Sequence, residues 1–234
     1  MDDLSRSMGL ALGLVTELDS TLLAIAGLSL RVSGVAVLAA SLLALPFGAW
    51  LALARFPGRQ LTIAILNGMM GLPPVVVGLL IYLLLSRAGP LGSLGILFTP
   101  AAMMVAQALL IFPIIAALSR QVIEDAWGEY REQLLSLNAT RGQCIGALLW
   151  DLRFTLLTAV LAGFGRAIAE VGAVMIVGGN IDGVTRVMTT AIALETSKGD
   201  LPLALALGLV LIGLVIAINT AAQAMKSFSM RHHG

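Results

Sequence analysis

Long apolar segments alternate with short polar ones along most of the chain, and their lengths predict membrane-spanning helices. A helix needs about 20 apolar residues to cross the hydrocarbon core of a bilayer. By this measure we expect five spans, at about residues 29–54, 61–85, 99–118, 154–177 and 201–222. A further apolar segment, 185–197, is amphipathic and too short to cross. The pattern therefore predicts an all-α integral membrane protein.

The first 28 residues differ from the spans. They are moderately apolar, but Glu17 and Asp19 would be costly at membrane depth. We therefore predict that 1–28 is a peripheral segment with a helix at the membrane surface. The acidic start, MDDLSRSMG, lacks the basic region of a cleaved signal peptide. No linker or second domain is evident, so we expect one transmembrane domain over 1–234.

The second span is interrupted by glycine and proline, at Gly71, Pro73 and Pro74. Consecutive prolines remove backbone donors and disfavour helix in the preceding residue. Because an unpaired carbonyl is costly in lipid, the break should face protein or a water-filled cavity. The segment is either a kinked packing helix or a broken helix that lines a pathway, as in many transporters. We favour the pathway.

The fourth predicted span carries two charges, Arg166 and Glu170. An ionised side chain in a span costs a few kcal/mol unless it is paired or hydrated. At a spacing of four residues the two lie on one face of a continuous helix and can neutralise each other. Two interpretations stay open: a structural ion pair, or a gate that changes partners between conformations. The near-zero net charge argues against a strong anion site here.

A polar segment, 119–153, separates the third and fourth spans, and its part from 129 to 153 has helical periodicity. Asn138 tolerates the left-handed conformation in which helices end, and Thr140 can cap a helix that starts at Arg141. We predict two short amphipathic helices with an exposed apolar ridge of Leu134, Leu135, Leu137, Ile145, Leu148 and Leu149. Such a ridge suits a groove on a soluble partner. The alternative is a solvated loop without a partner.

Composition supports the membrane class and argues against others. Hydrophobic residues make up 59% of the chain and charged residues 12%, against about 25% charged in soluble domains. A net charge of +1 gives no reason to expect nucleic acid. The single cysteine, Cys144, cannot build a disulfide framework or a metal cluster, and we expect it to pack between helices. The only histidines, His232 and His233, lie in the tail, and no span holds two aspartates, which argues against an intramembrane protease.

The positive-inside rule orients the spans, because cytoplasmic loops carry an excess of Lys and Arg. One side of the predicted topology holds Arg55, Arg59, Arg120, Arg131, Arg141, Arg153, Lys226 and Arg231. The other side holds Arg6, Arg31, Arg87, Arg186 and Lys198. This bias places the polar segment and the C-terminus in the cytoplasm and the N-terminus outside.

The stretch EQLLSLNATR, from Glu132 to Arg141, resembles the EAA loop of ABC-importer permeases, E-A-A-x-x-L-G-A-x-x. Glu132 matches the family's Glu, Leu134 its second alanine, and 137–139 its L-G-A, with Asn138 in place of glycine. Trp150-Asp151 stands where the family usually has Leu-Pro. Two further stretches, GLPPVVVG at 71–78 and GRAIAEVGA at 165–173, are similar to the molybdate, sulfate and tungstate importer permeases. The longer form GRAIAEVGAVMIVGGNI is most similar to the tungstate type.

The resemblance implies a type I ABC-importer permease fold, in a homodimer with the pathway at the twofold interface. Two ABC ATP-binding subunits would each receive one cytoplasmic coupling loop, 119–153, through Glu132, Leu134, Leu137, Asn138, Ala139, Thr140 and Arg141. An extracytoplasmic protein would deliver a tetrahedral oxyanion to this subunit in a bacterial or archaeal plasma membrane. The chain itself would be no enzyme and bind no cofactor, with ATP and Mg on the partner. It contains no G-x-x-x-x-G-K-[ST] phosphate loop.

Alternatives remain at two levels. Within the importer class, molybdate or sulfate competes with tungstate as the substrate. Outside that class, a channel or secondary transporter that needs no ATPase would require coupling groups in the membrane, and only Arg166 and Glu170 are available. Co-purification with an ATP-binding subunit separates the two classes.

Overall fold

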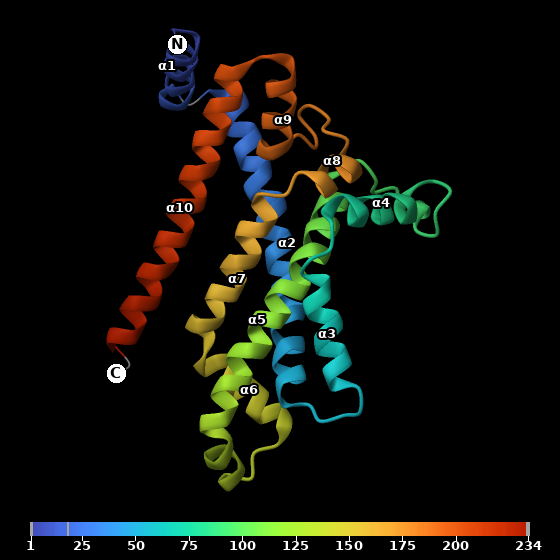
Figure 1. Cartoon of the computed structure of the whole chain (residues 1–234), viewed down its shortest axis with the longest axis vertical. Coiled ribbons are helices and arrows are strands. Elements are labelled where there is room, and N and C mark those ends of the chain that lie inside the picture. The colour runs from blue at the N-terminus through green and yellow to red at the C-terminus, as the bar shows by residue number, and fades with distance from the viewer. Residues whose placement is uncertain (1, 18, 233–234) are drawn as a thin grey trace. The chain divides into compact units, whose positions relative to one another are not determined.

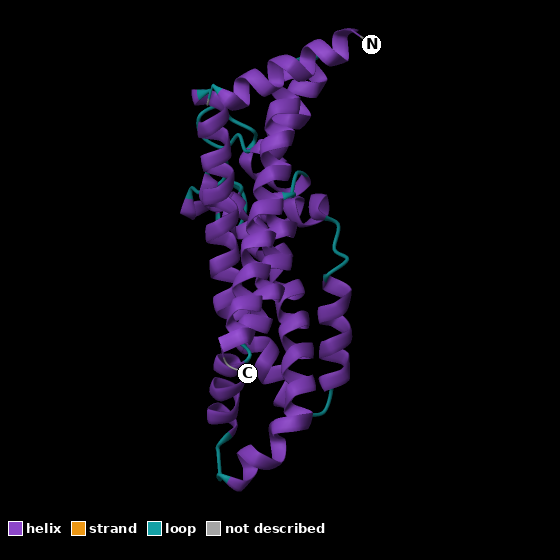
Figure 2. Ribbon diagram, turned by 90° about the vertical axis from the view of Figure 1, so that its left-hand side faces the viewer, coloured by secondary structure: helices purple, strands orange, loops and turns teal. Residues whose placement is uncertain are grey.

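The structure is a computed structural model that describes residues 2–17 and 19–232, so the tail position His233 lies outside the described residues. The described part consists of helices and connecting loops and contains no strand (Figure 2). Three of its helices are long and apolar enough to cross a membrane, and two broken pairs raise the number to five if each pair is one span. This confirms the all-α membrane fold with about five spans.

Two helices form at the N-terminus, α1 (Asp2–Thr16) and α2 (Ser20–Leu53) (Figure 1). Helix α2 begins well before residue 29, so the second part of the predicted peripheral segment is continuous with the long helix, and its position at the membrane surface stays a prediction. The acidic residues lie at the turn between the helices instead of inside one. Asp19 Oδ1 accepts a hydrogen bond from Leu22 N–H at 2.9 Å, which caps the start of α2. The carboxylate of Asp19, which argued against a membrane span in this region, therefore serves as a helix cap.

The predicted break in the second span is confirmed, between α3 (Arg59–Met69) and α4 (Pro74–Leu85). The N–H groups of 70–72 each bond the carbonyl three residues earlier, which tightens the end of α3. Pro73 has an extended backbone and Pro74 is the first residue of α4. The missing N–H of Pro74 costs little there, since the first helical residues have no intrahelical acceptor.

The third predicted span belongs to a much longer helix. After the 3₁₀ turn η1 (Gly92–Leu94), α5 (Pro100–Ser136) continues through Pro113 and the first half of the polar segment. The expectation that a loop starts at residue 119 is wrong, because polarity alone does not end a helix and no glycine or proline occurs between 114 and 127. At 1.5 Å per residue, its 37 residues extend about 55 Å, well beyond the ~30 Å hydrocarbon core.

The remaining helices are α6 (Arg141–Asp151), α7 (Arg153–Ile168), α8 (Gly172–Gly178), α9 (Met188–Lys198) and α10 (Leu201–His232). A continuous fourth span over 154–177 is a wrong prediction, since α7 and α8 are separated by three residues outside either helix. The predicted end at Gly178 is confirmed. Gly179 and Asn180 have left-handed φ values of 70° and 51°, which stop α8.

The described residues form two compact units. Unit 1 comprises Met1–Ala36, Pro73–Gln107 and Ile168–Ile218, and unit 2 comprises Val37–Leu72, Ala108–Ala167 and Asn219–Gly234. Helices α2, α5 and α10 contribute residues to both. In unit 2, a Cβ on Gly163 would stand 2.6 Å from Ile115 Cδ1, so small residues set the closest helix approach there. The single-domain organisation stays a prediction.

Candidate coupling hairpin and broken-helix crossing

The end of α5, the turn after it and α6 form a helical hairpin over residues 129–153, called here the polar hairpin. Asn138 has a left-handed φ of 52°, and Ala139 N–H bonds Leu134 O at 3.2 Å, which closes the end of α5. Thr140 and Gln143 then cap α6 reciprocally: Thr140 N–H donates to Gln143 Oε1 at 2.8 Å, and Gln143 N–H donates to Thr140 Oγ1 at 3.4 Å. The predicted break and second helix are confirmed.

The apolar side of α6 packs inward, against the rest of unit 2. Cys144 and Leu148 are buried in a cluster with Ile123 and Leu156, and Ile145 and Leu149 are partly buried beside it. The predicted exposed ridge is therefore wrong for α6, whose apolar residues cover the ends of the chain's own helices. Cys144, at 1% exposure, is the packing residue that we expected.

A smaller apolar surface on the polar hairpin remains exposed. Leu135 is 49% exposed, Leu137 71% and Trp150 72%. Leu137 and Trp150 also border a groove of about 300 Å³ between the end of α5 and α6. Around it, Glu132, Asn138, Thr140 and Arg141 are exposed, and Leu134 and Ala139 are half-buried. The hairpin thus presents bulky apolar groups beside polar ones, as a docking surface for another protein does.

An ion cluster that joins α2, α3 and α5 was missed from the sequence. Arg59 donates to Leu51 O at 3.0 Å and Ala52 O at 3.3 Å, and it pairs with Glu124 Oε1 at 2.9 Å. Arg120 pairs with the other oxygen of Glu124. The four-residue spacing of Arg120 and Glu124 was a visible signal, whereas nothing local connects Arg59 to them. The cluster joins the end of α2 to the extension of α5.

In unit 1, the ends of the two glycine-containing stretches 71–78 and 165–173 meet where α4 packs on α8 (Figure 1). A Cβ on Gly78 would lie 2.8 Å from Ala173 Cα, and one on Gly172 would lie 2.8 Å from Val75 Cγ2. Only residues without side chains permit so close a crossing. The helix that follows the Pro73-Pro74 break is thereby fixed against the segment that follows Glu170.

Glu170 is buried, with 3% exposure, in the break between α7 and α8. Its Oε1 accepts from Ala173 N–H at 3.0 Å, and its carbonyl accepts from Thr189 Oγ1 at 2.7 Å. Arg166 lies in the last turn of α7, which ends at Ile168, so the expected shared face of one continuous helix is wrong. Their ion pairing stays a prediction. In a membrane protein, backbone N–H and C=O groups outside helices need hydrogen-bond partners within the protein. Glu170 provides such partners in the break between α7 and α8.

The predicted pathway residues at the break differ in exposure. Gly71 and Pro73 are exposed and Pro74 is half-buried. The backbone around them is satisfied by the tight turn at 70–72. Their part in a pathway stays a prediction, and so does the alternative of a kinked packing helix.

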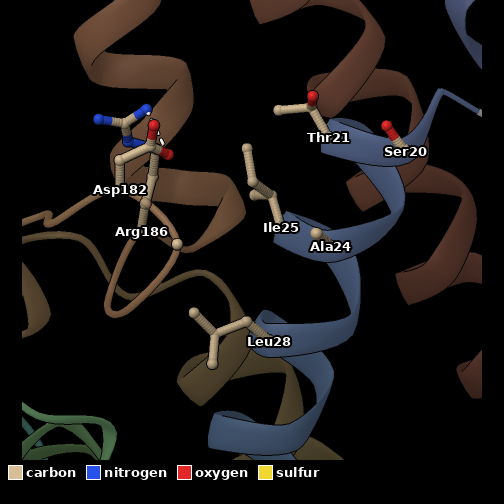
Figure 3. A pocket seen from close by; sticks show the side chains of 8 residues that line it. Ser20, Thr21, Ala24, Ile25, Leu28, Asp182 and Arg186 are labelled. Atoms are coloured by element: carbon tan, nitrogen blue, oxygen red, sulfur yellow. Dashed lines mark ion pairs between the residues drawn. The ribbon is translucent and has the colours of Figure 1, made fainter.

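A hollow of about 490 Å³ lies in unit 1 between the start of α2 and the loop after α8. Figure 3 shows Ile25 and Leu28 of α2 across from Asp182 and Arg186, with Ser20 and Thr21 at the helix start. Arg186 Nη1 pairs with Asp182 Oδ1 at 2.9 Å, so the positive charge is already compensated. The described residues contain no group of three or more His, Cys, Asp or Glu that could hold a metal ion. The charged residues that line this hollow therefore sum to no net charge.

No protein-family model matches the sequence. The chain is 39% identical over 226 residues to the tungstate uptake system permease protein TupB of Peptoclostridium acidaminophilum, a match that covers 97% of this chain and 99% of that protein. It is 37% identical to a probable anion ABC transporter permease of Haloferax volcanii, over 91% and 94% of the two chains. It is 30% identical to the molybdenum transport system permease ModB of Escherichia coli K12, over 74% and 80%.

Proposed function

Because the chain belongs to the family of ABC-transporter anion permeases that includes the tungstate uptake permeases, we propose that it forms the membrane pathway of an ATP-driven tungstate importer. The observation that carries this proposal is the 39% identity over nearly the whole length of both proteins. The chain is a multi-pass membrane protein, as its family and its apolar helices indicate. Molybdate is the second candidate substrate, because the chain is also similar, at lower identity, to a molybdenum transport permease.

The proposed partner at the polar hairpin is an ABC ATP-binding subunit, one for each copy of this chain. The support is the exposed apolar surface of Leu135, Leu137 and Trp150, at the end of the long helix α5, in the turn after it and on α6. Closure of the ATPase dimer would push on the hairpin, and the Arg59–Glu124–Arg120 cluster would carry the movement into α2 and α5. ATP and Mg would bind to the partner and not to this chain.

The proposed assembly is a homodimer with the pathway at its twofold interface. The support is the break at Gly71 and Pro73, which is exposed in a single chain although broken helices in lipid need protein or water around them. A second copy of the chain would supply the protein around the break, and the pathway between the copies would supply the water. Gly71, Pro73, Pro74, Arg166 and Glu170 are the proposed gate residues.

The proposed orientation places the polar hairpin and the C-terminus in the cytoplasm and the N-terminus outside. The excess of Lys and Arg on the hairpin side supports it. An extracytoplasmic binding protein would then deliver the oxyanion from outside the cell and would carry most of the selectivity.

The experiment is reconstitution of this chain in liposomes with its ATPase and its binding protein, with ATP inside. We expect ATP-dependent uptake of tungstate that exceeds uptake of molybdate and sulfate at equal concentration. Calorimetry on the binding protein with the same three anions shows whether delivery sets that order. Uptake that proceeds without ATP or without the ATPase would contradict the importer, and an order led by molybdate or sulfate would contradict the substrate alone.

A further inference from the structure

A second groove, of about 350 Å³, lies in unit 2 between α2 and the start of α7. Its walls are apolar, with leucines such as Leu42, Leu45 and Leu156, and it has two polar side chains, Arg153 and Ser41. Among the described residues no acidic side chain lines it. The groove therefore combines an apolar trough with one uncompensated cation.

The cation lines the groove and is held in place by its neighbours. Arg153 is the first residue of α7, and its Nη1 donates to Trp150 O at 2.6 Å. Its guanidinium lies 4.6 Å from the ring centroids of both Trp150 and Phe154. Further N–H donors of the guanidinium remain for an acceptor from outside. A basic side chain at the end of an apolar helix is typical of the membrane interface, where headgroups lie.

The second polar group of the groove is buried. Ser41 is 8% exposed, and its Oγ has no hydrogen-bond partner among the described residues. A buried serine in a helix normally bonds the carbonyl four residues earlier. Pro46 also lines the groove and lies five residues after Ser41 on α2. At 1.5 Å per residue, this separation is about 7.5 Å along the helix axis. The groove thus offers a second hydrogen-bond donor, on α2, in addition to the cation on α7.

We propose that this groove binds an anionic phospholipid. Its phosphate accepts hydrogen bonds from Arg153, its ester carbonyl accepts one from Ser41, and one acyl chain fills the apolar trough. Basic sites between membrane helices at the headgroup level commonly bind anionic lipids. The inference needs only a chain that lies in a membrane, so it stands apart from what the protein transports.

The test is native mass spectrometry of the purified full-length chain, titrated with phosphatidylglycerol or phosphatidylcholine. One basic residue near the headgroups contributes about 1 kcal/mol, so we expect about fivefold tighter binding of phosphatidylglycerol. Arg153→Ala should abolish that preference, and Arg131→Ala on the polar hairpin should keep it. Ser41→Ala should weaken binding of both lipids.

A variant that leaves Arg153 unchanged separates loss of the groove from loss of the charge. Leu42→Trp should fill the trough and reduce retained lipid severalfold, whereas Leu43→Trp, equally exposed on α2 but outside the groove, should not. Equal lipid retention by Leu42→Trp and Leu43→Trp, or an unchanged preference in Arg153→Ala, would overturn the proposal. So would efficient crosslinking of Leu42→Cys to a second copy, because the occupant would then be protein.

Discussion

Gly78 of α4 lies against the backbone of Ala173 of α8, so closely that a Cβ at Gly78 would stand 2.8 Å from Ala173 Cα and 3.2 Å from its carbonyl oxygen. Both contacts are backbone atoms, which cannot move aside by changing a rotamer. The contact brings together two stretches that are far apart in the sequence. It also fixes α4 against the segment that begins at Glu170.

Gly78→Ala should therefore destabilise the protein by about 1–3 kcal/mol, the usual cost of overpacking. The measurement is thermal unfolding of the purified chain in detergent. Gly34→Ala is the matched control, because a Cβ on Gly34 in α2 meets nothing within 4 Å. Equal melting temperatures for the two variants would show that α4 and α8 do not cross in this way.

Glu170→Ala should destabilise unit 1 by about 1–3 kcal/mol, because it leaves the buried Ala173 N–H without its acceptor. Glu170→Gln keeps an oxygen at the same position and should unfold close to wild type. The two variants are compared by melting temperature in detergent. A Gln variant as unstable as the Ala variant would show that the carboxylate charge, and not the cap on α8, is what matters.

The predicted pairing of Glu170 with Arg166 has its own test. If the two pair, Glu170→Ala should reduce assembled protein more than the double change Arg166→Ala/Glu170→Ala, since the single change leaves a lone charge in the membrane. Recovery in the double variant should be partial, because the acceptor for Ala173 is still absent. Uptake by membranes with matched protein levels is the second readout. A double variant as poor as the single one points to a direct role of the pair in transport.

Arg59→Ala should lower the free energy of unfolding by about 1–3 kcal/mol, since it removes three hydrogen bonds at the end of α2, one of them to the partly exposed Glu124. Arg59→Lys should lie between Ala and wild type, because an ammonium cannot reproduce the planar fork of donors. Arg55→Ala, an exposed neighbour, is the control. Detergent melting curves of the three variants check the order.

Asn138→Gly should preserve the polar hairpin, because glycine adopts the left-handed conformation freely. Asn138→Val should cost about 1–2 kcal/mol locally, as a β-branched residue at positive φ is strained. In pull-downs of the ATPase, we expect Asn138→Gly to behave as wild type and Asn138→Val to retain less. Equal retention by both variants would mean that the turn does not set the docking geometry.

Interactions between residues close in the sequence could be predicted, and interactions between distant residues could not. Asn138 and Thr140 act through neighbours two to five residues away, so the break between α5 and α6 could be predicted. The proline break at Pro73-Pro74 follows equally from local backbone rules. By contrast, the link from Arg59 to Glu124 spans 65 positions, and no periodicity encodes it.

Several wrong predictions arose because a residue was assigned a role before its partner was known. Asp19 suggested a surface helix but caps α2. The apolar run around Glu170 suggested a continuous helix, yet the carboxylate caps α8 in the gap after α7. On α6 the error was the reverse, because Leu148 was counted as exposed although it completes the core of unit 2. Packing decides such cases, and a single sequence does not contain it.

The measurement that tests the central claim most directly is co-purification of the ATP-binding subunit with Leu137→Asp. Leu137 is 71% exposed, so this change should leave the fold intact, with a melting temperature near that of the control Glu129→Ala. We predict that Leu137→Asp loses the ATPase and ATP-dependent tungstate uptake together, while Glu129→Ala keeps both. Full ATPase association and uptake with Leu137→Asp would contradict the account of the polar hairpin as the coupling surface.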